Sequence, residues 1–141
     1  MKFFKMALFA LILLPVSVAA GPNHAAVRSQ TLLQTSSSWD GTPYKAYPKG
    51  RPQLTVVKIT IPAHTTLALH THPMPMAAYV LSGELTVEKM ADGETRHFTE
   101  GQALAEIVNA AHRGMTGNAP VTLIVFYAGV KGLHLSESAE P

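Results

Sequence analysis

From Gln53 onward, short runs rich in apolar and β-branched residues alternate with short polar turns. Residues 54–61 are rich in valine, isoleucine and threonine, and Pro62 closes the run, as is typical of a β-strand. Turn signals such as Asp92-Gly93 separate the later runs. The predicted strands are 54–61, 66–72, 77–81, 84–90, 95–99, 103–108 and 121–127. The last run is apolar at nearly every position, so we expect it to be buried on both faces.

The spacing of these runs predicts the fold class. Strands recur about every eight to twelve residues with turn residues between them, and the same region shows no convincing helix. We therefore expect an all-β fold, a sandwich or barrel of roughly eight strands, in a single domain without internal repeats. A chain of 141 residues is long enough for one real core.

Two segments flank the predicted barrel, which spans residues 53–128. The preceding residues, 21–52, form an extension punctuated by glycine and proline, with one short strand predicted at 31–35 and a turn at 39–43. We expect Trp39 and Tyr44 to close one end of the core rather than to stack on a ligand. Residues 129–141 are expected to form a C-terminal tail with a frayed tip.

The first 20 residues have the features of a signal peptide. Lys2 and Lys5 give a positive start, residues 6–18 are almost wholly apolar, and the small residues that follow suit cleavage near Ala20. The apolar run is too short to span a membrane comfortably, which disfavours the alternative of an uncleaved anchor. We therefore expect a periplasmic or secreted protein with no stable membrane insertion after cleavage.

Composition restricts the chemistry of the mature chain. There is no cysteine, so disulfides are excluded and any metal site must use histidine, carboxylate, methionine or water as ligands. The formal net charge is +2, and two of the lysines lie in the leader. Because no basic run or aromatic-basic patch remains, we do not expect a nucleic-acid partner.

The strongest chemical signal is the pair His70 and His72 at the end of an apolar, alternating run. On a strand, residues two apart lie about 7 Å from each other with parallel side chains, so both imidazoles can reach one ion at about 2.0–2.1 Å. A third histidine, His112, follows another strand and turn, as a ligand from a facing strand would. The remaining histidines lie outside this pattern and are expected at turns or in solvent: His24, His64, His97 and His134.

These residues resemble the two motifs of the cupin family. The first motif, G-X5-H-X-H-X(3–4)-E-X6-G, matches at His70, His72 and Gly83, and the second, G-X5-P-X-G-X2-H-X3-N, matches at Gly101 and His112. The similarity covers residues 53–128, with the short intermotif segment seen in small bacterial cupins. The resemblance implies a cupin jelly-roll barrel that holds one divalent metal ion through the three histidines.

The chain departs from both motifs in informative ways. His64 and Asn109 stand where the motifs have glycine, and both residue types tolerate positive φ better than most, so we expect these turns to survive. The second motif's proline falls on Ile107 and its asparagine on Thr116. Met76 stands where the first motif has its glutamate, which exchanges a hard anionic ligand for a soft thioether.

Three interpretations of the fourth coordination position stay open. Water or a small molecule could take it, as at a catalytic metal; Met76 could bind, which would favour copper; or Glu106 could supply the missing carboxylate. Alternation along 103–108 places Glu106 on a face with two apolar side chains, where a charged group needs a partner. Against these stand two simpler interpretations, in which Met76 only lines the barrel and Glu106 faces solvent.

The sequence supports two functional hypotheses. In the first, the chain acts on or binds a small molecule at the metal centre, with Tyr79 and Glu106 as candidates for proton transfer; the resemblance is compatible with dioxygenase, isomerase, hydrolytic or lyase chemistry. In the second, the chain is a non-catalytic periplasmic module for a metal or ligand, with copper bound by Met76 as one version. The metal is not distinguished among Fe, Zn, Ni, Mn and Cu. The resemblance also allows a homodimer, with Leu67 and Leu69 either on the pairing face or inside the barrel.

Overall fold

The computed structural model describes residues 26–140, so the predicted signal peptide lies outside the described residues. The chain divides into two units, Met1–Gln30 and Thr31–Pro141. In the first unit, the described residues 26–30 form neither helix nor strand. The second unit contains nine strands and, as far as it is described, no helix. Between residues 26 and 140, no helix is long and apolar enough to cross a membrane.

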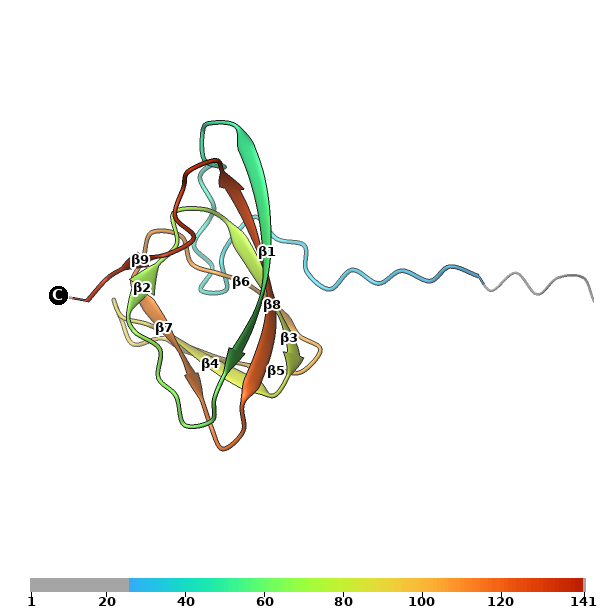
Figure 1. Cartoon of the computed structure of the whole chain (residues 1–141), viewed down its shortest axis with the longest axis vertical. Coiled ribbons are helices and arrows are strands. Elements are labelled where there is room, and N and C mark those ends of the chain that lie inside the picture. The colour runs from blue at the N-terminus through green and yellow to red at the C-terminus, as the bar shows by residue number, and fades with distance from the viewer. Residues whose placement is uncertain (1–25, 141) are drawn as a thin grey trace, which may run out of the picture. The chain divides into compact units, whose positions relative to one another are not determined.

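The nine strands lie in two antiparallel sheets. One sheet has the order β1-β8-β3-β6 and the other the order β5-β4-β7-β2-β9. In Figure 1 the sheets form two walls, with β1 and β8 side by side on one wall and β2, β7 and β9 on the other. This arrangement confirms the predicted all-β jelly-roll barrel. The strands are β1 (Pro52–Ile61), β2 (His70–Thr71), β3 (Met76–Ser82), β4 (Glu84–Lys89), β5 (Thr95–Thr99), β6 (Ala103–Ala105), β7 (His112–Thr116), β8 (Val121–Val130) and β9 (Glu137–Ser138).

The core lies between the two sheets and takes one face of each strand. In β8 the buried positions alternate with half-buried or exposed ones, so that Leu123 and Val125 are buried whereas Phe126 is 39% exposed. The prediction that 121–127 is buried on both faces is therefore wrong. An antiparallel sheet needs cover on one face only, and apolar side chains on the other face remain partly in solvent.

The predicted strands near the histidines are more irregular than expected. The run 66–72 pairs regularly only over β2, with isolated bridges at Thr66 and His72, and the predicted strand 103–108 is regular only over β6. The predicted strand at 31–35 does not form. Strand β7 was missed, because its sequence His-Arg-Gly-Met-Thr lacks the β-branched run that signals a strand.

The C-terminal segment is more structured than the predicted tail. Strand β8 continues to Val130, and β9 pairs antiparallel with β2, His70 opposite Ser138 and Thr71 opposite Glu137. The prediction of a frayed tip is thus wrong for the described residues up to 140. Backbone pairing with β2 holds this segment in place.

Two turns adopt positive φ without glycine. His64 has a φ of 54° and Asn109 a φ of 58°, at the positions where the cupin motifs have glycine. Both turns are held by main-chain hydrogen bonds, from His64 N–H to the Gly117 carbonyl at 2.8 Å and from Asn109 N–H to the His72 carbonyl at 2.9 Å. The expectation that these turns survive the loss of glycine is confirmed, since histidine and asparagine tolerate this region.

Candidate metal centre

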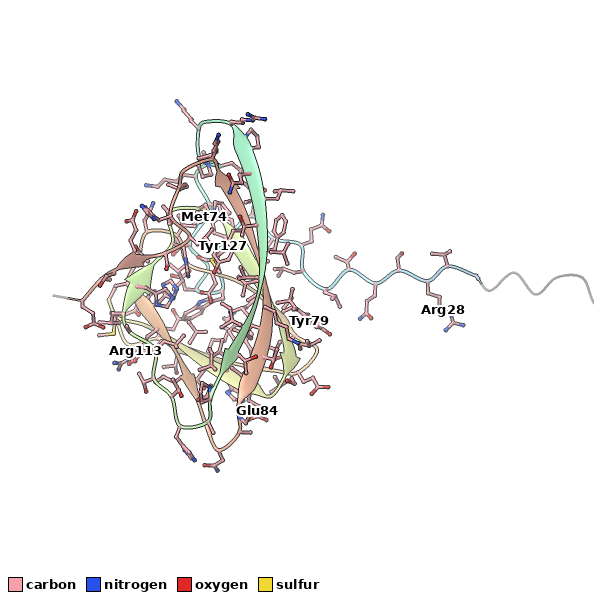
Figure 2. The ribbon with its side chains drawn as sticks, viewed as in Figure 1. Arg28, Met74, Tyr79, Glu84, Arg113 and Tyr127 are labelled. Carbon is pink, nitrogen blue, oxygen red and sulfur yellow. The ribbon has the colours of Figure 1, made fainter. Side chains whose placement is uncertain are left out.

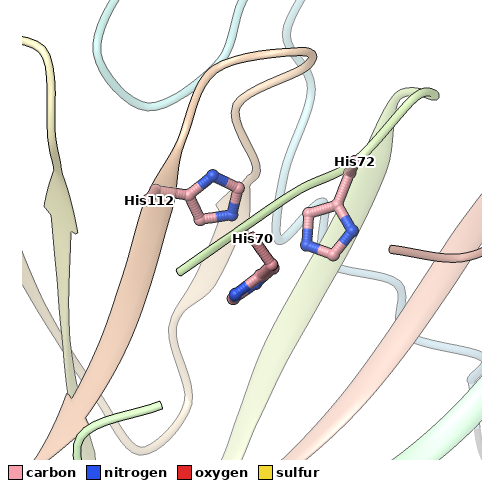
Figure 3. Close-up of side chains that lie close together, drawn as sticks. All are labelled: His70, His72 and His112. Carbon is pink, nitrogen blue, oxygen red and sulfur yellow. The ribbon is translucent and has the colours of Figure 1, made fainter. Parts of the chain in front are cut away.

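Three histidines from neighbouring strands gather inside the barrel. His70 on β2 lies directly opposite His112 on β7, and His72 follows two residues along the chain. The ring centroids are 4.6 Å apart for His70 and His112, 4.9 Å for His70 and His72, and 5.1 Å for His72 and His112. One nitrogen of each ring lies within 4.8 Å of the other two, and Figure 3 shows the rings converging. The expectation that these three side chains lie together is confirmed.

Each of the three imidazoles is oriented by a hydrogen bond from Nδ1 to a main-chain carbonyl oxygen. The acceptors, at 2.7–2.8 Å, are Ala68 for His70, Leu135 for His72 and Ala110 for His112. A carbonyl oxygen can only accept, so in the neutral ring the proton is on Nδ1 and Nε2 keeps its lone pair. A hydrogen bond from one ring nitrogen is the usual way in which proteins orient a metal-binding histidine.

Burial favours the neutral form of two of these rings. His72 is 4% exposed and His112 is 1% exposed. Burial lowers the pKa of His72 to about 4, although its bond to the Leu135 carbonyl acts in the opposite direction. Burial likewise lowers the pKa of His112, against its bond to the Ala110 carbonyl. Neutral imidazole is the form that binds a metal, so both rings suit a cation.

Glu106 brings a carboxylate to the same place. It follows β6 directly and is 7% exposed, and its Oε2 lies 3.6 Å from His112 Nε2. Both atoms are buried without a hydrogen-bond partner in the described part of the chain. Burial raises the pKa of Glu106 to about 7, against the opposing influence of His70 and of the Ile107 N–H group. A carboxylate oxygen and a ring lone pair facing each other in a buried site fit a cation between them.

The facing wall is formed by Met76 and Tyr127, which are direct cross-strand partners on β3 and β8. The Tyr127 ring centroid lies 5.9 Å from that of His72, and Figure 2 shows Tyr127 inside the ring of strands. Burial, and after it the charge of Glu106, raises the pKa of the Tyr127 hydroxyl. Met76 is buried and lines the same cavity as the histidines, so it lies beside the site as expected.

The cavity around these groups is small and largely aliphatic. Its volume is about 80 Å³, whereas pockets for drug-sized ligands measure about 300–1,000 Å³. It therefore has room for an ion with a few further atoms. Two larger hollows, each of about 410 Å³, are lined by none of the three histidines. The remaining lining residues of the small cavity are Ile59, Ile61, Leu67, Ala78, Leu85, Val87, Gly114, Leu123 and Val125.

Tyr79 does not lie where the sequence predicts it. On β3 the buried inward positions are Met76, Ala78 and Val80, so Tyr79 has the opposite parity and points to the outer face, as Figure 2 shows. The expected placement of Tyr79 beside the metal is wrong, and Tyr127 is the tyrosine that lines the cavity.

The extension before the barrel supports Glu106 through its main chain. Tyr44 donates its hydroxyl hydrogen to the Glu106 carbonyl at 2.7 Å, and Glu106 N–H donates to the Met76 carbonyl at 3.1 Å. Trp39 is buried in the core cluster, which confirms its predicted packing role, and its Nε1–H has no acceptor among residues 26–140. The two hydrogen bonds from Tyr44 and to Met76 fix both main-chain polar groups of Glu106, and thereby the position of its side chain.

The other histidines stay apart from the cavity. His64, His97 and His134 are exposed, and His97 lies near Glu84, with 3.3 Å between its Nε2 and the nearer carboxylate oxygen. His24 lies outside the described residues. Leu67 lines the cavity, so the alternative that placed it inside the barrel is the one observed.

Comparison with known proteins identifies the fold. No family model matches the chain, and no curated protein matches it. Among the solved structures that match is the DMSP lyase DddQ from Ruegeria pomeroyi, with a TM-score of 0.56 and 19% identity over 72% of this chain and 48% of that chain. Others are the polyketide cyclase RemF from Streptomyces resistomycificus (TM-score 0.55, 15% identity, 65% of this chain and 63% of that chain) and a cupin-like protein from Thermotoga maritima (TM-score 0.51, 14% identity, 60% and 63%). The match spans about half the length of the DMSP lyase. At these identities the likeness shows the fold alone, and that fold is the cupin fold.

Proposed function

We propose that this chain is an exported cupin-fold protein that binds one divalent transition-metal ion through His70, His72 and His112. The observation that carries the proposal is the shared orientation of the three rings. Each Nδ1–H is committed to a main-chain carbonyl, which leaves three Nε2 lone pairs for a common ion. Three imidazoles without thiolates suit zinc, iron, nickel, manganese or copper.

Glu106 is the fourth protein group that we assign to this centre. Its buried Oε2 lies 3.6 Å from His112 Nε2 and has no other partner within the described residues. We propose that this carboxylate replaces, from the strand β6 side, the glutamate that the first motif lacks at Met76. It would either bind the ion or hold a proton at Oε2 for a group bound beside it.

The size of the cavity limits what else can bind. A bound ion would act as a Lewis acid and orient a small ligand at its open position. With about 80 Å³ available, we propose that the ligand is a molecule of a few heavy atoms, or the reactive end of a larger one. Tyr127 lies where its hydroxyl can orient such a ligand, because it lines the cavity opposite the histidines.

The test of this proposal is metal content. We expect native protein to contain about one transition-metal ion per chain by elemental analysis, and His112→Ala or His70→Ala to lower that content severalfold. His97→Ala is the matched control, since His97 is exposed and lies outside the cavity. An unchanged number of metal ions per chain in the His112→Ala and His70→Ala proteins would refute the proposal.

A second candidate function is a non-catalytic copper-binding module. It is favoured by Met76, whose thioether is buried and lines the cavity with the three histidines. Thioether and imidazole ligands together suit copper. Met76→Leu keeps the volume of the side chain and removes the sulfur, so Cu(I) affinity that does not change would assign Met76 to packing alone.

Export is proposed from the leader alone. Lys2, Lys5 and the apolar run to residue 18 support it. Expression of the full chain in a bacterium, followed by mass spectrometry of the periplasmic fraction, tests it. We expect a mature protein that starts near Gly21, and an uncleaved chain found only with membranes would contradict export.

A further inference from the structure

The three histidines differ in what holds them. His70 and His112 each donate to a carbonyl two residues earlier in their own chain segment, that of Ala68 and that of Ala110. His72 instead donates to the carbonyl of Leu135, which is 63 residues away in the C-terminal segment. Two of the three ligands are therefore oriented locally, whereas the third depends on a distant part of the chain.

The C-terminal segment 133–140 is attached beside β2 by main-chain and side-chain contacts. β9 pairs with β2, and Ala139 N–H donates to the Leu69 carbonyl at 2.9 Å. Leu69 N–H in turn donates to Glu140 Oε1 at 2.8 Å. The side chains of Leu133 and Leu135 are partly buried against the core. These contacts hold the Leu135 carbonyl oxygen 2.7 Å from His72 Nδ1.

The segment also pairs with one of the two shortest strands of the barrel. β2 has only two paired residues and lies between β7 and β9. Without β9 it would become a two-residue edge strand, with its outward N–H and C=O groups unpaired. The strand that carries His70 and precedes His72 is thus fixed on one side by His112 and on the other by the C-terminal segment.

We propose that segment 133–140 is a positioning element of the metal centre, which orients His72 through the Leu135 carbonyl and completes the site only when it is docked on β2. This inference deepens the proposed function and rests on it. With the segment undocked, His72 loses its Nδ1 acceptor, and its ring can turn or move its proton to Nε2, where the proton blocks the ion. The ligands His70 and His112 keep their own acceptors.

The test uses full-length protein and two matched double variants. Ala139→Pro with Glu140→Ala removes both hydrogen bonds to Leu69, because proline has no N–H. Ala139→Ser with Glu140→Gln is the conservative control, which keeps an N–H and a side-chain carbonyl acceptor at the same positions. Zinc affinity is measured by competition with a chromophoric chelator. Loss of a group that orients a ligand lowers metal affinity by about 10–100-fold, and we expect that loss in the first variant only.

The same pair of variants in a His72→Ala background separates positioning from general weakening. If the segment acts through His72, undocking it lowers zinc affinity no further once that ring is absent. If the proline variant loses as much zinc affinity in the His72→Ala background as it does with His72 present, the inference is overturned. Zinc affinity in the proline variant within about twofold of the conservative control would also overturn it.

A metal-free measurement keeps the inference testable if the native chain takes up no zinc. In nitrogen-15 NMR spectra of the histidine rings, we expect His72 to carry its proton on Nδ1 in the native chain and to show both tautomers in the proline variant. His70 and His112 should keep the Nδ1–H form in both. If the native chain shows this pattern but binds none of zinc, iron, nickel, manganese and copper, the proposed function alone is refuted. An Nδ1–H form of His72 that persists in the proline variant would refute the positioning role.

Discussion

Gly83, the last glycine of the first motif, lies in the turn between β3 and β4. Its replacement by alanine tests whether glycine is required there because the main chain of a neighbouring strand comes close. The φ of Gly83 is +82°, and a Cβ at this position would overlap the Pro120 carbonyl oxygen and meet Val121 Cα at 3.0 Å. These are backbone atoms at the start of β8 and cannot rotate aside. Gly101, with φ +85°, has nothing within 4 Å of the same added atom. The two alanine variants therefore share the same unfavourable φ, and only Gly83→Ala also makes a close contact with neighbouring backbone atoms.

The magnitude follows from these two geometries. A side chain in the left-handed region costs about 1–2 kcal/mol, of which about 0.4–1 kcal/mol is offset because alanine reduces the freedom of the unfolded chain. Overlap with fixed neighbours adds about 1–3 kcal/mol, at Gly83 only. We expect Gly101→Ala to lower the free energy of unfolding by about 1 kcal/mol and Gly83→Ala to lower it by about 2–4 kcal/mol.

Thermal and urea denaturation of metal-free protein, followed by circular dichroism, measures the difference. At about 4 °C per kcal/mol, Tm should fall by about 4 °C for Gly101→Ala and by about 8–16 °C for Gly83→Ala. The urea m-value should stay the same, since neither variant changes the surface exposed on unfolding. Equal losses in the two variants would refute the reasoning, because the backbone conformation alone would then explain the need for glycine.

Three further predictions concern the extension before the barrel and two positions within the barrel. Burial acts to raise the pKa of Asp40, but hydrogen bonds from Ser38, Thr42 and Lys89 outweigh it and hold that pKa well below 3.8. The resulting stability is present above about pH 4 and is lost as the pH falls below it. Asp40→Asn should therefore unfold at lower urea concentration at pH 7 and lose less stability than the native chain between pH 7 and pH 3; an unchanged pH dependence would contradict this. Thr116→Val should cost about 1–2 kcal/mol in urea denaturation, because the Thr116 hydroxyl donates to the Pro62 carbonyl at 2.6 Å and accepts from Thr65 N–H at 2.9 Å; Thr116→Ser should recover most of that loss. Asn109→Gly should match or slightly exceed the native Tm and Asn109→Ala should fall below it, since φ at this residue is 58°; equal values for the two variants would count against a strained turn.

Much of the fold follows from local patterns in the sequence. Alternation and turn residues located most strands, because side-chain period and turn chemistry act over a few neighbouring residues. The spacing of His70 and His72 is sufficient to predict that both imidazoles lie on one face, and the motif position of His112 predicts the third member of the cluster. These features can be predicted from the sequence because each strand, turn and motif depends on residues that are close together in the chain.

Strand register was decided only by tertiary pairing. The alternation of β3 does not fix which parity faces inward. The sequence therefore predicts Tyr79 at the site, whereas Tyr127 lies there opposite Met76. A shift of one residue exchanges the two faces of a strand. Glu106 was among the candidates, but its burial near His112 depends on where β6 ends and on contacts with the extension.

The proposed metal centre shows most clearly what the sequence determines and what the tertiary structure determines. The sequence by itself determined which three side chains could bind an ion, because their chemical identity and their spacing are encoded there. Only the tertiary structure decided how they are held, because the acceptor for His72 is a main-chain carbonyl 63 residues away. Every residue carries such a carbonyl, so no side chain at Leu135 marks the group that orients the ligand.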